Sequence, residues 1–95
     1  MTTQVHDNDR DSRYEITRDG ERVGLSEYQR NGERVTFLHT EVDPTLRGEG
    51  LGEQLVSGAL DDVRKRGERV VARCPYVKRF ITEHPEYQDL VEPLE

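Results

Sequence analysis

Three short stretches in the first half of the chain are predicted to be β-strands: apolar and polar residues alternate in the first, less regularly in the second, and the third is the longest. The stretches cover residues 13–18, 23–29 and 33–42. Between them stand Asp19-Gly20 and Asn31-Gly32, two pairs that are typical of tight hairpin turns. We therefore predict an antiparallel meander of three strands.

The longest of these strands has apolar residues at both odd and even positions, which favours a place inside the sheet. Strict alternation divides its residues between two faces. One face would carry Val35, Phe37, His39 and Glu41, and the other Thr36, Leu38, Thr40 and Val42. His39 and Glu41 are thus expected on the same face as Phe37.

The second half of the chain changes to a helical period. Asp43-Pro44-Thr45 breaks the long strand, and apolar residues recur at helical spacing over residues 51–66, before Gly67. A short apolar strand at 69–73, a helix at 76–83 after Pro75 and a closing segment at 87–94 follow. A helix between two strands predicts a β-α-β crossover with parallel, adjacent strands, so the fold class is α+β.

The first residues differ from the rest. Residues 2–12 contain one apolar side chain, Val5, and we predict a disordered tail over residues 1–12. Residues 13–95 are predicted to form one domain, because a chain of 95 residues leaves no room for a second core. The composition is 32% hydrophobic and 36% charged, so that core should be small.

The net charge of −6 and the lack of a long basic run argue against nucleic acid as a partner, and weakly favour a cationic acceptor such as an amine. No stretch has the length of a membrane span, and the first residues lack the apolar segment of a signal peptide. Cys74 is the single cysteine, so no intrachain disulfide can form. We expect a soluble, cytoplasmic protein, either a monomer or a weak dimer, with no membrane partner.

Three glycines, Gly48, Gly50 and Gly52, alternate between the end of the long strand and the start of the first helix. Glycine lets the backbone turn sharply and approach a ligand closely, and the first amides of a helix have no intrahelical partners. This pattern favours a diphosphate site, with the Arg47 guanidinium at its rim. Glu53 stands where a Rossmann motif needs glycine, and no Gly-Lys-Ser/Thr is present for a P-loop. A plain connecting turn is the alternative.

Arg47-x-x-Gly50-x-Gly52 resembles the acetyl-coenzyme A signature of the GNAT acyltransferase superfamily, Gln/Arg-x-x-Gly-x-Gly/Ala. Further stretches resemble its branch of very small, single-domain N-acetyltransferase-like proteins: residues 37–42, 58–60, 74–77 and 84–87. The resemblance covers residues 14–90. It implies a minimal GNAT fold with acetyl-coenzyme A as co-substrate. The resemblance also implies which residues contact the cofactor. Glu41 and Val42 would lie beside the pantetheine arm, and the diphosphate would be surrounded by Gly48, Glu49, Gly50, Leu51, Gly52 and Glu53.

One departure from the larger members concerns the acceptor. Those enzymes have a pair of helices after the first strand that helps to bind the acceptor, and here the Asp19-Gly20 turn stands in its place. The acceptor therefore cannot be inferred from the resemblance.

Acetyl transfer needs a deprotonated amine and a proton for the departing thiolate. Cys74, at the end of the second parallel strand and the start of a helix, is a candidate nucleophile or acid, because a helix N-terminus stabilises a thiolate. Glu41 and His39 are candidate bases. Tyr76 and Arg79 are candidates for contacts with the cofactor. Each of these residues also has a purely structural interpretation, and none has the spacing of metal ligands, so we expect no metal.

Two functions of different class follow. The first is an enzyme that transfers acetyl from acetyl-coenzyme A to an amine, and the second is a module that binds coenzyme A or an acyl form without turnover. The missing acceptor helices favour the module, whereas Cys74 and Glu41 near the expected thioester favour the enzyme, which we prefer. A weaker alternative is an adaptor that pairs through an open sheet edge.

Overall fold

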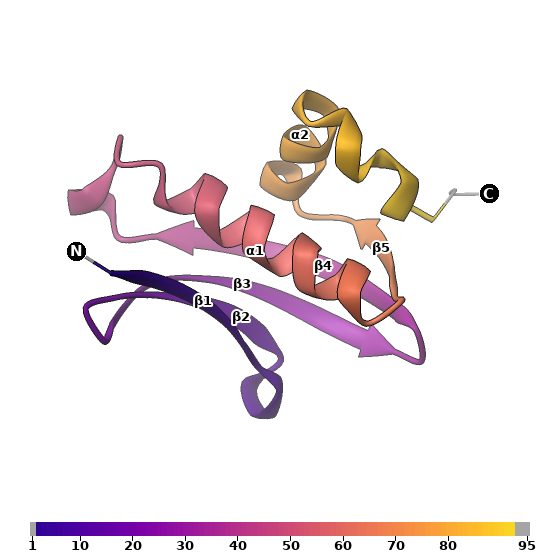
Figure 1. Cartoon of the computed structure of the whole chain (residues 1–95), viewed down its shortest axis with the longest axis horizontal. Coiled ribbons are helices and arrows are strands. Elements are labelled where there is room, and N and C mark those ends of the chain that lie inside the picture. Colours follow the sequence, from indigo (N-terminus) through magenta and orange to yellow (C-terminus); the bar gives the residue numbers. More distant parts are fainter. Residues whose placement is uncertain (1, 93–95) are drawn as a thin grey trace.

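The computed structural model describes residues 2–92, in which a five-stranded sheet carries two α-helices (Figure 1). The strand order is β1-β2-β3-β4-β5. The strands are β1 (Thr3–Asn8), β2 (Arg13–Arg18), β3 (Glu21–Asn31), β4 (Arg34–Val42) and β5 (Arg69–Ala72). The first four pair antiparallel, and β5 pairs parallel with β4. The predicted meander and the predicted parallel pair are confirmed.

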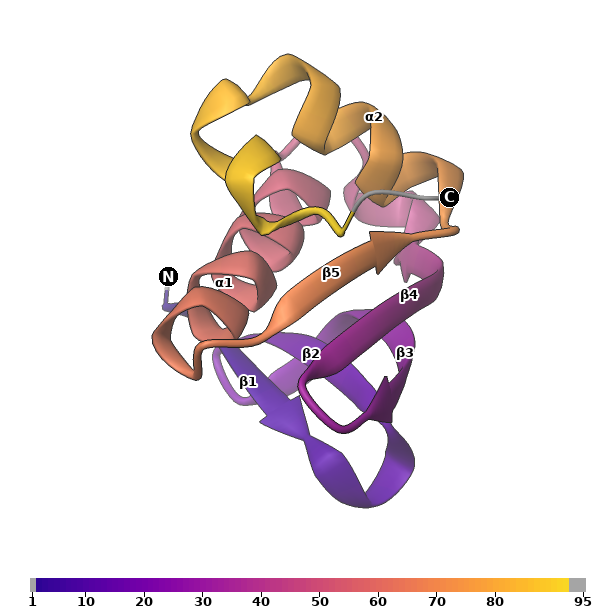
Figure 2. The same cartoon turned by 90° about the vertical axis from the view of Figure 1, so that its right-hand side faces the viewer.

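Helices α1 (Leu51–Lys65) and α2 (Pro75–Glu83) lie on one face of the sheet, and short 3-10 turns cover Asp9–Asp11, Pro44–Leu46 and Pro85–Leu90 (Figures 1 and 2). The apolar sides of both helices share one core with the inward residues of the strands. We call the opposite face of the sheet the outward face. The predicted closing segment is a 3-10 turn followed by Val91, which bridges to Val70, and its last two residues lie outside the described part.

The prediction of a disordered tail over residues 1–12 is wrong for residues 2–12, and residue 1 lies outside the described part. Residues 3–8 form β1, which pairs with the whole of β2. Its single apolar residue, Val5, packs against Gly58 of α1, where a Cβ atom would lie 2.8 Å from Val5 Cβ. Polar contacts hold the rest of the strand: Asp7, for example, accepts hydrogen bonds from Tyr28 and Arg30. A strand held by polar contacts has no alternation of apolar and polar residues, so its sequence does not predict a strand.

The assignment of β4 residues to two faces is also wrong beyond Phe37. Glu27 lies opposite His39 and Tyr28 lies opposite Phe37, so Leu38 is a bulged residue without a partner of its own. A bulge inserts one residue and reverses the faces after it. Phe37 therefore points into the core, whereas His39 and Glu41 point outward, and Thr40 and Val42 take the inward positions.

Candidate functional site

The parallel strands separate halfway along β4. Their pairing runs only from Arg34 with Arg69 to Phe37 with Ala72. Beyond it, the backbone N–H groups of Arg73 and Cys74 both donate to the carbonyl of Phe37, at 3.1 and 2.9 Å, and the chain turns into α2. Residues 39–42 continue along β3 alone. The second half of β4 therefore borders a gap in the sheet.

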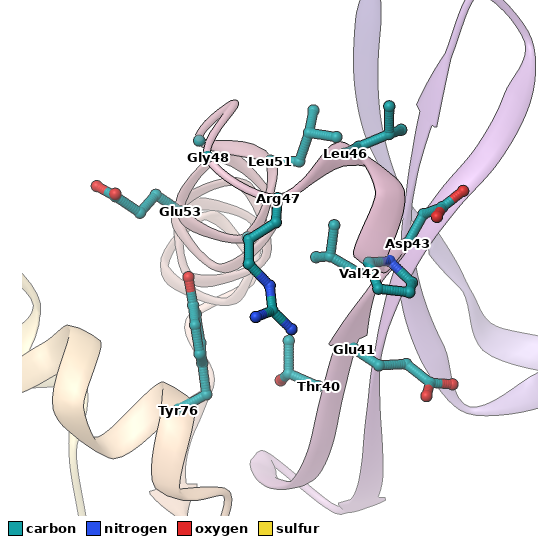
Figure 3. Close-up of a pocket in the computed structure, with 13 residues that line it drawn as sticks. Thr40, Glu41, Val42, Asp43, Leu46, Arg47, Gly48, Leu51, Glu53 and Tyr76 are labelled. Atoms are coloured by element: carbon teal, nitrogen blue, oxygen red, sulfur yellow. The ribbon is translucent and has the colours of Figure 1, made fainter.

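A pocket of about 440 Å³ lies between this gap and the start of α1 (Figure 3). We call it the loop pocket. Its lining consists of the end of β4, the glycine-containing loop, the first turn of α1 and one residue of α2: Thr40, Glu41, Val42, Asp43, Pro44, Leu46, Arg47, Gly48, Gly50, Leu51, Gly52, Glu53 and Tyr76. Most of the predicted cofactor-binding residues thus line a single cavity. Thr40, Asp43, Pro44 and Leu46 were not predicted, because only the three-dimensional path of the loop brings them there.

The start of α1 offers backbone donors to this pocket. Gly48 and Gly50 have φ angles of 90° and 73°, a region that favours glycine. Gly50 is the N-cap and has no side chain to cap the helix, and the amide of Gln54 is the first to bond back to it, at 3.1 Å. The amides of residues 51–53 are therefore free of intrahelical partners, as an anion site at a helix N-terminus requires.

Gly52 makes room for Tyr76. A Cβ atom at position 52 would lie 2.5 Å from the phenolic oxygen of Tyr76. The ring thus stands across the first turn of α1, at the mouth of the pocket (Figure 3). Burial raises the pKa of the Tyr76 phenol, and the neighbouring Glu53 carboxylate raises it further. The phenol is therefore protonated, and able to donate, at neutral pH.

The charged side chains around the glycine-containing loop differ in whether they face the loop pocket. Arg47 extends into the space between Tyr76 and β4 (Figure 3). The carboxylate of Glu49 lies 2.7 Å from the guanidinium of Arg18 on β2, so its charge is compensated outside the pocket. Glu49 itself does not line the pocket. Glu53 remains at the rim as a negative charge that opposes anion binding there.

The predicted base candidates lie on the outward face. His39 Nε2 and Glu41 Oε2 are 3.5 Å apart, and the two side chains are 57% and 62% exposed. Figure 3 shows the carboxylates of Glu41 and Asp43 directed away from the pocket interior, on the opposite side of β4 from Val42. His39 and Glu41 are thus accessible from the outward face, which carries no α-helix among the described residues.

The structure places Cys74 behind the pocket wall. It is the N-cap of α2, as predicted, but only 2% of it is exposed and it does not line the loop pocket. Its thiol donates to Thr40 Oγ1 at 3.4 Å, and Thr40 Oγ1 is 2.8 Å from Ser26 Oγ. Thr40 thus separates Cys74 from the cavity.

Arg79, another predicted cofactor contact, points elsewhere. It lines a hollow of about 240 Å³ beside α2 with Glu53 and Tyr76, and pairs with Glu83 at 3.3 Å. Within residues 2–92, no cluster of three or more His, Cys, Asp or Glu side chains is suited to hold a metal ion. None of the helices in that range is both long and apolar enough to cross a bilayer.

A family model described as GCN5-related N-acetyl-transferase matches residues 13–90. This chain belongs to that family. Among curated relatives, Protein NATD1 of Bos taurus is 35% identical over 69 residues, which are 70% of this chain and 61% of that protein. Protein NATD1 of Homo sapiens is 32% identical over 69 residues, with the same 70% and 61% coverage. The match therefore spans about six tenths of the length of these relatives.

Several solved structures share the fold of this chain. The solution structure of a GCN5-like protein from Staphylococcus aureus has a TM-score of 0.71 at 20% identity and covers 97% of this chain and 90% of its own. The ribosomal-protein-S18-alanine N-acetyltransferase of Escherichia coli has a TM-score of 0.59 at 24% identity, covering 63% and 39%. AAC(6')-Iy, solved with a bisubstrate analogue that contains coenzyme A, has a TM-score of 0.51 at 17% identity, covering 87% and 63%.

Proposed function

We propose that this protein binds acetyl-coenzyme A in the loop pocket and transfers its acetyl group to an amine. The observation that carries the proposal is the position of an uncapped helix N-terminus beside a gap in the sheet. The first feature suits a diphosphate and the second suits an extended arm that pairs with a strand edge. Family membership and the coenzyme A moiety in the AAC(6')-Iy complex support the same ligand.

In this proposal the diphosphate contacts the amides of residues 48–53, and Arg47 pairs with a phosphate oxygen. The pantetheine arm follows the free edge of β4 past Val42 and Glu41. The thioester then reaches the gap where β4 and β5 separate. Apart from Arg47, the expected contacts are backbone groups, which explains how a protein of net charge −6 can hold an anionic ligand.

The chemistry needs two proton transfers. The amine nitrogen attacks the thioester carbonyl, the N–C bond forms and the C–S bond breaks. Glu41, or His39 beside it, takes the proton that the amine loses. The Tyr76 phenol, protonated at neutral pH, gives a proton to the departing thiolate, and its own proton is restored from solvent. The products are an N-acetyl amide and free coenzyme A.

Cys74 suggests a second route, in which its thiol takes the acetyl group before the amine does. The burial of that thiol behind Thr40 favours direct attack, because the covalent route would require Thr40 to move aside. Intact mass after incubation with acetyl-coenzyme A, without acceptor, distinguishes the routes. Direct attack predicts no acetyl group on Cys74, and a single acetyl group mapped to Cys74 would establish the covalent route.

Calorimetry with coenzyme A and with NAD tests the ligand. We expect coenzyme A to bind and to raise the melting temperature, and NAD to do neither. Gly50→Val should weaken coenzyme A binding at least tenfold with the fold retained, because valine disfavours the φ of 73° and its branched side chain intrudes on the phosphates. Equal affinity for the two nucleotides, or normal binding by folded Gly50→Val, would remove the assignment. Binding without transfer to any amine would leave a coenzyme A-binding module.

A further inference from the structure

A second hollow, of about 230 Å³, lies at the same end of the sheet as the loop pocket. We call it the outer hollow. Its lining comes from the start of β3 and the end of β4: Arg22, Val23, Gly24, Leu25, Glu41, Val42, Asp43 and Pro44. Four of these residues, 41–44, also line the loop pocket. The end of β4 is therefore a shared wall between the two cavities.

The registers of the strands place the outer hollow on the outward face. Leu25 lies opposite Glu15 on one side and Glu41 on the other. Leu25 is buried but is absent from the core beneath the helices, so it forms an apolar floor on the outward side. The hollow thus opens away from α1 and α2, on the side where the Glu41 carboxylate is exposed (Figure 3).

One wall of the outer hollow is positive. The Arg22 guanidinium lies 3.5 Å from the Glu15 carboxylate, and the Arg22 side chain is 48% exposed. Glu15 has nearer partners: Arg13 at 2.7 Å, Asn8 at 3.0 Å and His6 at 3.1 Å. Because Glu15 is satisfied without Arg22, the N–H donors of Arg22 are available to an anionic group in the hollow.

The facing wall is negative. Glu41 and Asp43 both contribute carboxylates. Hydrogen bonds from the Thr45 hydroxyl and the Thr45 amide, at 2.7 and 2.9 Å, lower the pKa of Asp43 and keep it ionised. A hollow with a guanidinium on one side, carboxylates on the other and an apolar floor is complementary to a ligand that carries both an ammonium and a carboxylate.

The volume limits the size of that ligand. Pockets for drug-sized molecules measure roughly 300–1,000 Å³, so a hollow of about 230 Å³ suits a molecule no larger than an amino acid. The ammonium end belongs beside Glu41, because Glu41 and Asp43 are the carboxylates that border both cavities, and Glu41 is the proposed base.

Resting on the acetyl transfer proposed above, we propose that the outer hollow is the acceptor site and that the acceptor is a small amino-carboxylate. Its carboxylate pairs with Arg22 and its ammonium with Glu41. Loss of one ammonium proton to Glu41 frees the nitrogen to attack the thioester carbonyl, and the nitrogen gives a second proton to solvent as the amide forms. The N–C bond forms, the C–S bond breaks, and the thiolate leaves as the thiol with a proton from Tyr76. The product is an N-acetylamino-carboxylate.

The test compares acceptors that differ only in the carboxylate. Transfer is measured with L-alanine, β-alanine and γ-aminobutyrate, each beside its carboxamide, in the wild type and in Arg22→Gln. We expect at least one amino-carboxylate to be preferred over its carboxamide in the wild type. In Arg22→Gln the ratio of the two kcat/KM values for that pair should fall at least tenfold, with the Kd for coenzyme A unchanged. Because each ratio uses the same two amines, their intrinsic reactivities cancel between the proteins.

Arg34→Gln is the matched control. Arg34 is on the same strand as Glu41 and pairs with Glu92, but does not line the outer hollow. Its ratios should equal those of the wild type. Equal ratios in wild type and Arg22→Gln, or a general preference for carboxamides, would overturn the proposal.

A binding measurement separates this proposal from the proposed function. Amide chemical shifts of the coenzyme A-loaded protein are followed during titration with γ-aminobutyrate, β-alanine and L-alanine. Shifts confined to residues 22–25 and 41–43, and weakened in Arg22→Gln, support the acceptor site even if no transfer occurs, in which case the transferase function alone fails. Transfer to amines with no such shifts for any of the three would leave the transferase function standing and overturn the acceptor site.

Discussion

At the scale of single residues, the glycines of the loop have separate tasks. Gly48 and Gly50 adopt positive φ angles with open space around them, so conformation demands glycine there. Gly52 has an ordinary helical conformation, and the Tyr76 hydroxyl demands glycine there instead. The sequence pattern predicted the loop and its helix, because glycine spacing is local. It did not predict the contacts of Gly52 with Tyr76 or of Thr40 with Cys74, because these join distant parts of the chain.

Gly52→Ala should move Tyr76 from its place over α1. We expect any acetyl transfer to fall about tenfold, equivalent to about 1.4 kcal/mol of barrier, because the proton donor is displaced. Stability should change little. The preference for alanine over glycine in a helix, about 1 kcal/mol, offsets the cost of moving the Tyr76 ring. Rate measurements in a Tyr76→Ala background provide the control: there Gly52→Ala should have no further effect. An equal loss of rate in both backgrounds would contradict the role given to Tyr76.

At the scale of elements, β1 marks the limit of sequence reasoning. The sequence predicted the hairpins, α1, β5 and α2, because turn residues and apolar periods depend only on residues that are close together in the sequence. β1 and the bulge at Leu38 were not, since a polar edge strand has no apolar alternation and the bulge is visible only in the pairing with β3. The bulge decides the site, because it turns His39 and Glu41 outward.

Glu15 links β1, β2 and β3 through a carboxylate that is almost fully buried. Burial raises its pKa, but hydrogen bonds from Asn8, Arg13 and His6 outweigh this and lower the pKa from 4.5 to about 2. A depressed carboxyl pKa stabilises the fold above pH 4.5, and this contribution disappears as the pH falls through about 2. Its size is on the order of 3 kcal/mol, from about 1.36 kcal/mol per pKa unit.

Glu15→Gln should therefore destabilise the protein most at neutral pH. Urea unfolding of wild type and variant at several pH values measures the difference in the free energy of unfolding. We expect this difference to be largest at pH 7 and to shrink steadily below pH 4.5. A difference in the free energy of unfolding that stays constant down to acid pH would mean that the charge of the Glu15 carboxylate does not stabilise the fold.

At the scale of the whole molecule, the two ends of the sheet have different tasks. The end with the glycine loop contains the loop pocket and the outer hollow. Elsewhere, Arg30 of β3 joins Asp7 of β1 to Glu68 before β5, at 3.2 and 2.8 Å. This buried set of charges connects the first and last strands of the sheet, and none of its members lines either cavity. This set of charges therefore holds the sheet together without contributing to either cavity.

The second half of β4 pairs with a strand on one side only, and this should affect how fast its backbone amide hydrogens exchange with solvent. The amide of Asp43 donates to Val23 of β3 at 2.8 Å, so alternation directs the amides of Thr40 and Val42 toward the gap. Their hydrogens should exchange with deuterated solvent far faster than those of the neighbouring residues 39 and 41 in the free protein. Coenzyme A should slow them selectively if its arm lies along this edge, and unchanged exchange in the saturated protein would place the arm elsewhere. A strand paired on one side only thus turns every second amide into a residue-by-residue reporter of occupancy.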